Sequence, residues 1–98
     1  MDIIVTGKHL DIGDSLRTYV ENQLNEITSK YAVQVIDAAV VITKEKKGFF
    51  CVDVTVHLGS GTTLKSKAEG TDPYNTVDAA NKNIATRLMR YKDKAKDR

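Results

Sequence analysis

Cys51, His57 and His9 are the side chains in this sequence that could ligate a metal ion or form an activated nucleophile. A nucleophilic cysteine needs a base within hydrogen-bonding reach, and a zinc site needs ligands at short spacings. Cys51 and His57 stand six residues apart in one predicted strand, which separates them by about 20 Å. Because no CxxC, HxxxH or HExxH spacing occurs, we expect no enzyme site, no metal centre and no cofactor. The simpler interpretation is that Cys51 fills space and His57 is an ordinary strand residue.

Positive charge near the end of the chain is the remaining candidate for function. Residues 1–70 carry eight Lys and Arg against nine Asp and Glu, whereas residues 71–98 carry seven against four. Arg87, Arg90 and Lys94 follow at spacings of three and four, which places them on one face of a helix. Cations about 5–6 Å apart can follow the phosphates of a nucleic acid. Charge alone leaves an alternative, a solvated helix end whose cations suit the negative end of the helix dipole.

Aromatic residues offer no obvious row for stacking on bases. Phe50 and the tyrosines are mostly expected in the core. The expected mode of binding is therefore recognition of the shape and phosphates of structured RNA, not sequence-specific reading of single strands.

A helix that begins at Pro73 must carry these cations. Asp72 can cap its first turn, and Pro73 has no N–H to leave unsatisfied at the first helical position. Apolar residues recur at helical spacing along one stripe of this helix, and they are Tyr74, Val77, Ala80, Ile84, Leu88 and Tyr91. The cations fall beside this stripe, so we expect them on the surface.

The central segments alternate between apolar and polar residues, which predicts strands with one buried face. Residues 50–58 show the clearest alternation, and residues 63–69 follow after a Gly-Ser-Gly turn, with Ser66 on the inner face. An earlier strand is expected to turn four apolar residues inward, and they are Ile36, Ala38, Val40 and Ile42. The first strand is short and centres on residues 3–5.

A first helix precedes these central strands, with Gly13 as its N-cap. Its apolar stripe comprises Leu16, Val20, Leu24, Ile27 and Tyr31. The order β-α-β-β-β-α, with a right-handed crossover, makes the first two strands parallel and the later pairs antiparallel. We therefore predict an α+β two-layer sandwich, in which a four-stranded mixed sheet carries both helices on one face.

The length of 98 residues fits one domain, with residues 92–98 as a basic, frayed tail. Hydrophobic residues make up 41% and charged residues 29% of the chain, which is typical of soluble globular proteins. No apolar run approaches the roughly 18 residues of a membrane span, and the opening residues lack the layout of a secretory signal. The lone cysteine excludes an internal disulfide, so we expect a protein of the reducing cytoplasm. We also expect no membrane partner and no small-molecule substrate.

The full-length pattern resembles that of the ribosome hibernation promoting factors, also called ribosome-associated translation inhibitors. Three segments carry the resemblance: IIVTGKHLDIGDSLRTYV at the start, TKE before Gly48, and SKAEGTDPYNTVDAANKNIATRLMRYKDK near the end. The last segment is the most specific, because a strand ending in AEG leads into Asp-x-Tyr and a helix that closes in a basic run. The family fold implied is β-α-β-β-β-α, which resembles a double-stranded-RNA-binding domain.

The resemblance implies a binder of the small ribosomal subunit and its rRNA, and no enzyme activity. Such proteins occupy the channel for mRNA and tRNA, and they inhibit translation under stress or in stationary phase. Basic residues at or beside the family's basic positions are the implied rRNA contacts, and they are Lys8, Arg17, Lys30, Lys44, Lys82, Arg87, Arg90, Lys92 and Lys94. Asn83 and Thr86 stand where the family often has cations, so Lys82 and Arg87 are expected to substitute from neighbouring positions.

Two questions stay open at the level of sequence. The chain matches either a short form of the family or the N-terminal domain of a long form, whose second domain pairs ribosomes. The competing functions are a double-stranded-RNA-binding module without ribosome specificity and a protein-interaction domain that uses the sheet face around Asp53, Thr55 and Lys65.

Overall fold

The elements follow the predicted order along the chain. The structure, a computed structural model, describes residues 1–31 and 33–96. Within these ranges the elements are β1 (Asp2–Lys8), α1 (Asp14–Ser29), β2 (Val35–Lys44), β3 (Phe50–Leu58), β4 (Thr63–Gly70) and α2 (Pro73–Lys96). A 3₁₀ turn, η1 (Lys46–Gly48), connects β2 to β3. The last two residues of the predicted basic tail, 97–98, lie outside the described residues.

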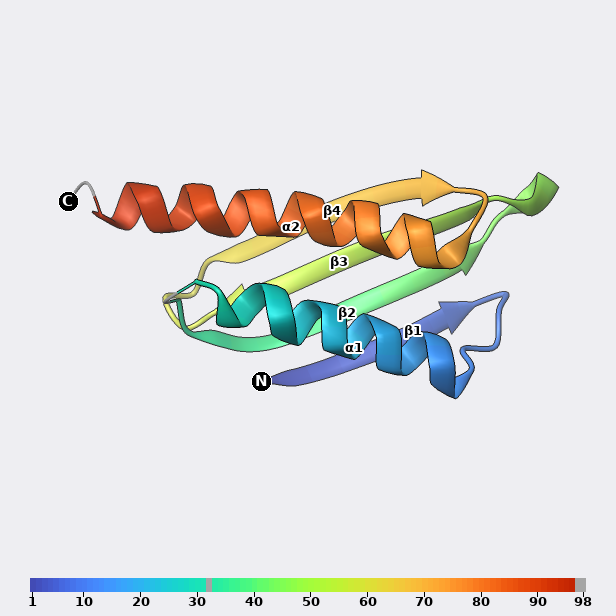
Figure 1. The fold of residues 1–98 in the computed structure, drawn as a ribbon, viewed down its shortest axis with the longest axis horizontal. Helices are drawn as coiled ribbons and strands as arrows, with labels where there is room; N and C mark the ends of the chain where they lie inside the picture. Colours follow the sequence, from blue (N-terminus) through green and yellow to red (C-terminus); the bar gives the residue numbers. More distant parts are fainter. Residues whose placement is uncertain (32, 97–98) are drawn as a thin grey trace.

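The strands form one mixed sheet in the order β1-β2-β3-β4. β1 runs parallel to β2, with Val5 opposite Val40, and the other two pairings are antiparallel. Both helices cover the same face of this sheet, and α2 extends past the ends of the strands (Figure 1). The molecule is elongated, measuring 47 × 21 × 19 Å. These observations confirm the predicted fold class.

The core lies between the inner sheet face and the two helices. Val52, Val54 and Val56 of β3 are fully buried. The helical residues that cover this face are Leu16, Val20, Leu24, Val77, Ile84 and Leu88. Each such side chain contributes roughly 1.5–3 kcal/mol when it is removed from water. The predicted inner faces of β2 and β3 are therefore confirmed from Ala38 onward.

The prediction for Ile36 is wrong. Its side chain is 52% exposed, because the register of β2 against β3 shifts between Val35 and Asp37. A bulge places two residues opposite one and turns the extra side chain out of the pleat. Val35, which pairs with Leu58, packs against the core in place of Ile36, and the predicted inward alternation resumes at Ala38.

Capping fixes the start of α2 as predicted. Oδ1 of Asp72 accepts hydrogen bonds from the backbone N–H groups of Tyr74, at 2.8 Å, and Asn75, at 3.3 Å.

The prediction that Tyr74 joins the core is wrong, because its side chain is 38% exposed. Its ring meets Tyr19 of α1 edge to face, with ring centroids 5.1 Å apart. The Tyr19 hydroxyl in turn donates to Asp78 of α2 at 2.5 Å, and this bond raises the pKa of Tyr19.

Ser66 and Asn81 are buried polar side chains with opposite consequences for stability. Ser66 is buried on the inner face of β4, where its hydroxyl donates to the Ala80 carbonyl of α2 at 2.8 Å. This bond accounts for a polar residue at an inward position. Asn81 is only 1% exposed, and its side-chain amide has no hydrogen-bonding partner among the described residues. A buried polar group without a partner costs free energy on folding.

Replacing Asn81 with leucine should stabilise the domain. The change exchanges an unpaired buried amide for an apolar side chain of similar volume, so we expect the free energy of unfolding to rise by about 1–3 kcal/mol. Urea denaturation followed by circular dichroism measures it. Asn83→Leu, at an exposed position of the same helix, is the control and should change stability by about 0.5 kcal/mol or less. A destabilised Asn81→Leu variant would show that the Asn81 amide is not an unpaired buried group.

Val54→Asp should abolish or nearly abolish folding. Val54 is fully buried in the central part of the sheet, and an aspartate there would place an unpaired charge in the core. Thr55→Asp, one residue further on the open face and opposite Lys65, is the control and should fold. A cooperative melt of Val54→Asp near the temperature of the unmodified chain would show that this register is incorrect.

Candidate nucleic-acid interface

A groove runs beside the C-terminal half of α2. Arg87, Arg90 and Lys94 line it together with Leu64 of β4 and Tyr91 of α2, and its volume is about 460 Å³. The three cations are exposed, and they lie within about 60° of one another around the helix axis. Asp93 contributes an acidic group to the same wall. The predicted sharing of one helix face is therefore confirmed for these three cations.

Tyr91 holds this half of α2 against the sheet. Its hydroxyl donates to Oγ of Ser60, in the turn between β3 and β4, at 2.6 Å. Leu64 follows this turn at the start of β4, so the strand and the helix line the groove from two sides. Alternation with Ser66 predicts an inward position for Leu64, and the apolar stripe of the helix predicts one for Tyr91. Their position next to a cationic surface comes from the long-range contact with Ser60, for which the spacing of residues gives no signal.

The other two predicted cations of α2 lie differently. Lys82 is exposed two turns before Arg90, but it stands about 140° from Arg87 around the axis and so lies off the row. Lys92 stands about 160° from Arg90 and is partly buried. The structure therefore places Lys92 away from the groove.

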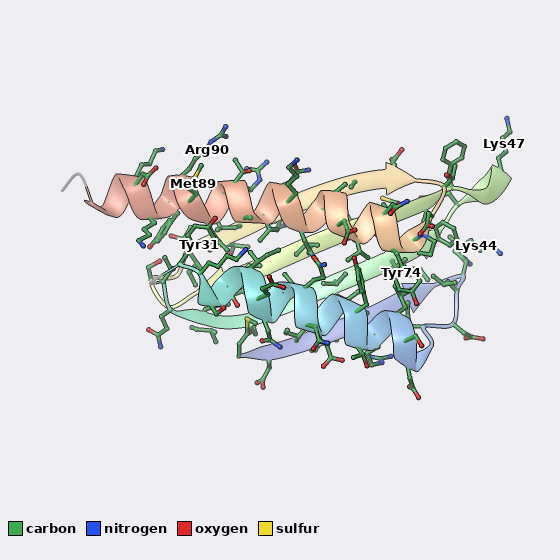
Figure 2. The ribbon with its side chains drawn as sticks, in the orientation of Figure 1. Tyr31, Lys44, Lys47, Tyr74, Met89 and Arg90 are labelled. Atoms are coloured by element: carbon green, nitrogen blue, oxygen red, sulfur yellow. The ribbon has the colours of Figure 1, made fainter. Side chains whose placement is uncertain are left out.

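Two predicted cations lie at the far end of the molecule. Lys8 ends β1 opposite Thr43, and Lys44 follows Thr43 in β2. Figure 2 shows Lys44 and Lys47 toward the end of the long axis opposite to Arg90. The structure thus divides the predicted contacts between two ends of an elongated domain.

Arg17 of α1 and Lys30, the C-cap residue of this helix, have partners within the chain. Nη1 of Arg17 donates to the Val5 carbonyl of β1 at 3.1 Å, which ties the helix to the edge strand. Nζ of Lys30 lies 4.0 Å from the Glu26 carboxylate, and both side chains are mostly exposed. Such a surface ion pair is weak and leaves Lys30 able to contact another group.

Cys51 and His57 do not meet. Cys51 is buried next to Asp53, with Sγ 3.8 Å from Oδ2. His57 contacts Asp37 on the open face of the sheet. Burial raises the pKa of the Cys51 thiol above its ordinary value, and the Asp53 carboxylate raises it further. Among the described residues, no group of three or more His, Cys, Asp or Glu side chains could hold a metal ion.

The Cys51 thiol should react slowly in the folded protein. Its raised pKa keeps thiolate scarce at pH 7–8, and burial limits access of a reagent. We expect alkylation by iodoacetamide, followed by mass spectrometry, to be at least roughly tenfold slower than in the guanidinium-denatured chain. The control is Thr63→Cys in a Cys51→Ala background, where the thiol is exposed. Equal rates for Cys51 and the control thiol would contradict the burial.

The fold and the groove define a class of protein. It is a small α+β domain in which two helices cover one face of a sheet, and the second helix bears a row of exposed cations near its C-terminal end. The sequence pattern of the Sigma 54 modulation protein / S30EA ribosomal protein family matches residues 3–96. The chain belongs to this family, which confirms the resemblance found in the sequence. No helix in the described ranges is long and apolar enough to cross a membrane.

Individual relatives agree with this assignment. The chain is 37% identical over 98 residues to a ribosome hibernation promotion factor of Rhizobium meliloti, covering 99% of this chain and 50% of that protein. It is 29% identical over 96 residues to a ribosome hibernation promoting factor of Salmonella typhimurium, covering 98% of each. The chain thus spans about half the length of the first relative and nearly all of the second.

Solved structures show the same architecture. A ribosomal subunit interface protein from Coxiella burnetii superposes with a TM-score of 0.82 at 29% identity, covering 95% of this chain and 99% of that one. The N-terminal domain of Protein Y from Thermus thermophilus gives a TM-score of 0.82 at 27% identity, covering 93% and 99%.

Proposed function

We propose that this domain is a ribosome hibernation factor, which binds the small ribosomal subunit through rRNA in the channel for mRNA and tRNA. Occupying that channel would inhibit translation under stress or in stationary phase. Family membership and the names of the relatives support this function. The structural observation that carries it is the exposed row of Arg87, Arg90 and Lys94 along one groove.

The row has the properties of a phosphate-binding surface. None of its three cations forms an ion pair with another described residue. Binding to phosphates would therefore break no intramolecular salt bridge of these groups. Neutralising phosphates releases condensed counterions, so the affinity should depend steeply on salt. This chemistry needs no catalytic group, and we propose a binding role in the cytoplasm without a cofactor or small-molecule substrate.

The proposal concerns the activity of this domain. Pairing of ribosomes is proposed only for a longer chain with a second domain, because the chain spans about half the length of the longer relatives. Among the remaining predicted contacts, Lys8 and Lys44 lie at the end opposite to the row, and Lys30 caps the C-terminal end of α1. We propose that the α2 row supplies most of the electrostatic affinity.

Replacing Arg90 and Lys94 with glutamine should weaken binding and flatten its salt dependence. If about four to six cations meet phosphates, log K falls with log salt at a slope of roughly −3 to −5, and losing two contacts reduces it by about two units. Both side chains are exposed, so stability should change by about 0.5 kcal/mol per site or less. The measurement is the affinity for purified small subunits across a salt series, with cell-free translation in parallel.

The matched control removes two cations elsewhere. Lys65 and Lys67 are exposed on the open face of β4, and Lys65→Gln with Lys67→Gln should leave both the slope and the inhibition of translation nearly unchanged. Equal losses in the two double variants would show that net charge, not the groove, governs binding. Competition with tRNA tests the channel, and equally tight binding to a plain RNA duplex would instead favour a module without ribosome specificity.

A further inference from the structure

The connection between β2 and β3 is a second cationic surface, at the end of the molecule opposite to the α2 groove. We call residues 44–49 the β2–β3 tip. The tip contains three lysines, Lys44, Lys46 and Lys47, and one acidic residue, Glu45. All four side chains are exposed. Figure 2 shows Lys47 at the extreme of the long axis, away from Arg90. The tip is therefore a cationic surface separate from the α2 row.

An aromatic ring accompanies these lysines. Phe49 is 46% exposed, whereas the next residue, Phe50, packs against the core. Burying a phenylalanine side chain contributes roughly 1.5–3 kcal/mol, and Phe49 forgoes much of this. By strand alternation it belongs to the same side of the sheet as Asp53 and His57, which is the side that the helices leave uncovered.

The backbone holds this ring in place. Lys44 and Phe50 form the last pair of the β2–β3 ladder, and the Glu45 N–H donates to the Phe49 carbonyl at 2.7 Å. Lys47 and Gly48 both have positive φ, 64° and 76°, which closes the turn tightly. A left-handed conformation is uncommon for a residue with a side chain. Phe49 is thus presented by a closed turn, so little backbone ordering remains when the ring meets a partner.

We propose that the β2–β3 tip binds an unpaired nucleotide of RNA, with Phe49 stacked on the base and Lys46 and Lys47 on the flanking phosphates. Stacking of a base on an aromatic side chain is worth about 1–3 kcal/mol and tolerates any base, because each has a π-face. The site deepens the proposed function and rests on it for the source of the RNA. It adds base stacking to the phosphate recognition that the sequence predicts, and the domain then holds RNA at both ends.

Affinity for purified small subunits tests the ring. Phe49→Ala should weaken binding by about 5- to 150-fold, which corresponds to the loss of one stacked base. Phe49→Leu should weaken it similarly, whereas Phe49→Tyr should retain affinity. Ile4→Ala, an exposed apolar residue on the open sheet face at 64% exposure, is the matched control and should bind normally. Full affinity of Phe49→Leu would indicate an apolar protein partner and overturn base stacking.

Fluorescence tests the same site without the ribosome. The chain contains no tryptophan, so Phe49→Trp introduces a single reporter. A single-stranded oligoadenylate at low salt should quench it, and a duplex of equal length, whose bases are already stacked, should not. Quenching by both RNAs alike, or by neither, would overturn the nucleotide site.

The two measurements separate the proposals. Quenching by oligoadenylate without any binding of the unmodified chain to small subunits would remove the ribosomal function and leave the tip as an RNA site. Unchanged subunit binding by Phe49→Ala would remove the tip and leave the ribosomal function intact.

Discussion

The packing of one strand face against two helices determines how the rest of this domain is arranged. Val52, Val54 and Val56 of β3 are fully buried, and burying them needs apolar cover along the whole strand. One helix is too narrow to cover a sheet of this width, so α1 and α2 lie side by side on the same face (Figure 1). The opposite face therefore carries no helix among the described residues, and polar and charged side chains such as Asp37, His57 and Lys65 lie on it.

The length of α2 converts this packing into an exposed cationic surface. A helix of 24 residues measures about 36 Å, whereas the eight-residue strand β4 beside it measures about 27 Å. The C-terminal part of the helix therefore extends past the sheet, where no strand covers it. Tyr91 anchors the last covered turn to Ser60, so the row begins on a fixed part of the helix. Arg87, Arg90 and Lys94 are exposed because it is the neighbouring apolar stripe of the helix that packs against the core.

Local patterns explain why most of the fold is readable from sequence. Alternation in residues 50–58 and the Asp72–Pro73 start signal each depend on neighbours only a few residues away, and the structure confirms both. The errors arise where distant contacts decide. Ile36 is turned outward by a shift in hydrogen-bond register with β3, and the exposed Tyr74 ring packs edge to face on Tyr19 of α1 instead of joining the core.

The candidate site divides along the same line. Helical spacing predicted that Arg87, Arg90 and Lys94 share a face. It could not predict that Leu64 and Tyr91 complete a groove there, since that depends on how the β3–β4 turn meets α2. The exposure of Phe49 could not be predicted for a related reason. Alternation indicates the side of a strand on which a residue lies, but not whether another element covers that side. Residues 44–47 are all charged, so their sequence does not indicate that the turn they form presents a ring.

Two proposed RNA contacts at opposite ends of a rigid domain give specificity that neither contact has alone. Phosphate binding by the α2 row is indifferent to sequence, and stacking on one aromatic ring tolerates every base. Because the sheet fixes the spacing between the row and the tip within a molecule 47 Å long, only an RNA that offers phosphates and an unpaired base at that separation engages both. The second contact then forms at high effective concentration, whereas an RNA with the wrong separation engages one end only. A uniform duplex offers phosphates everywhere but no unpaired base, so a folded RNA with a fixed arrangement of helices and single-stranded segments is the better partner for such a domain.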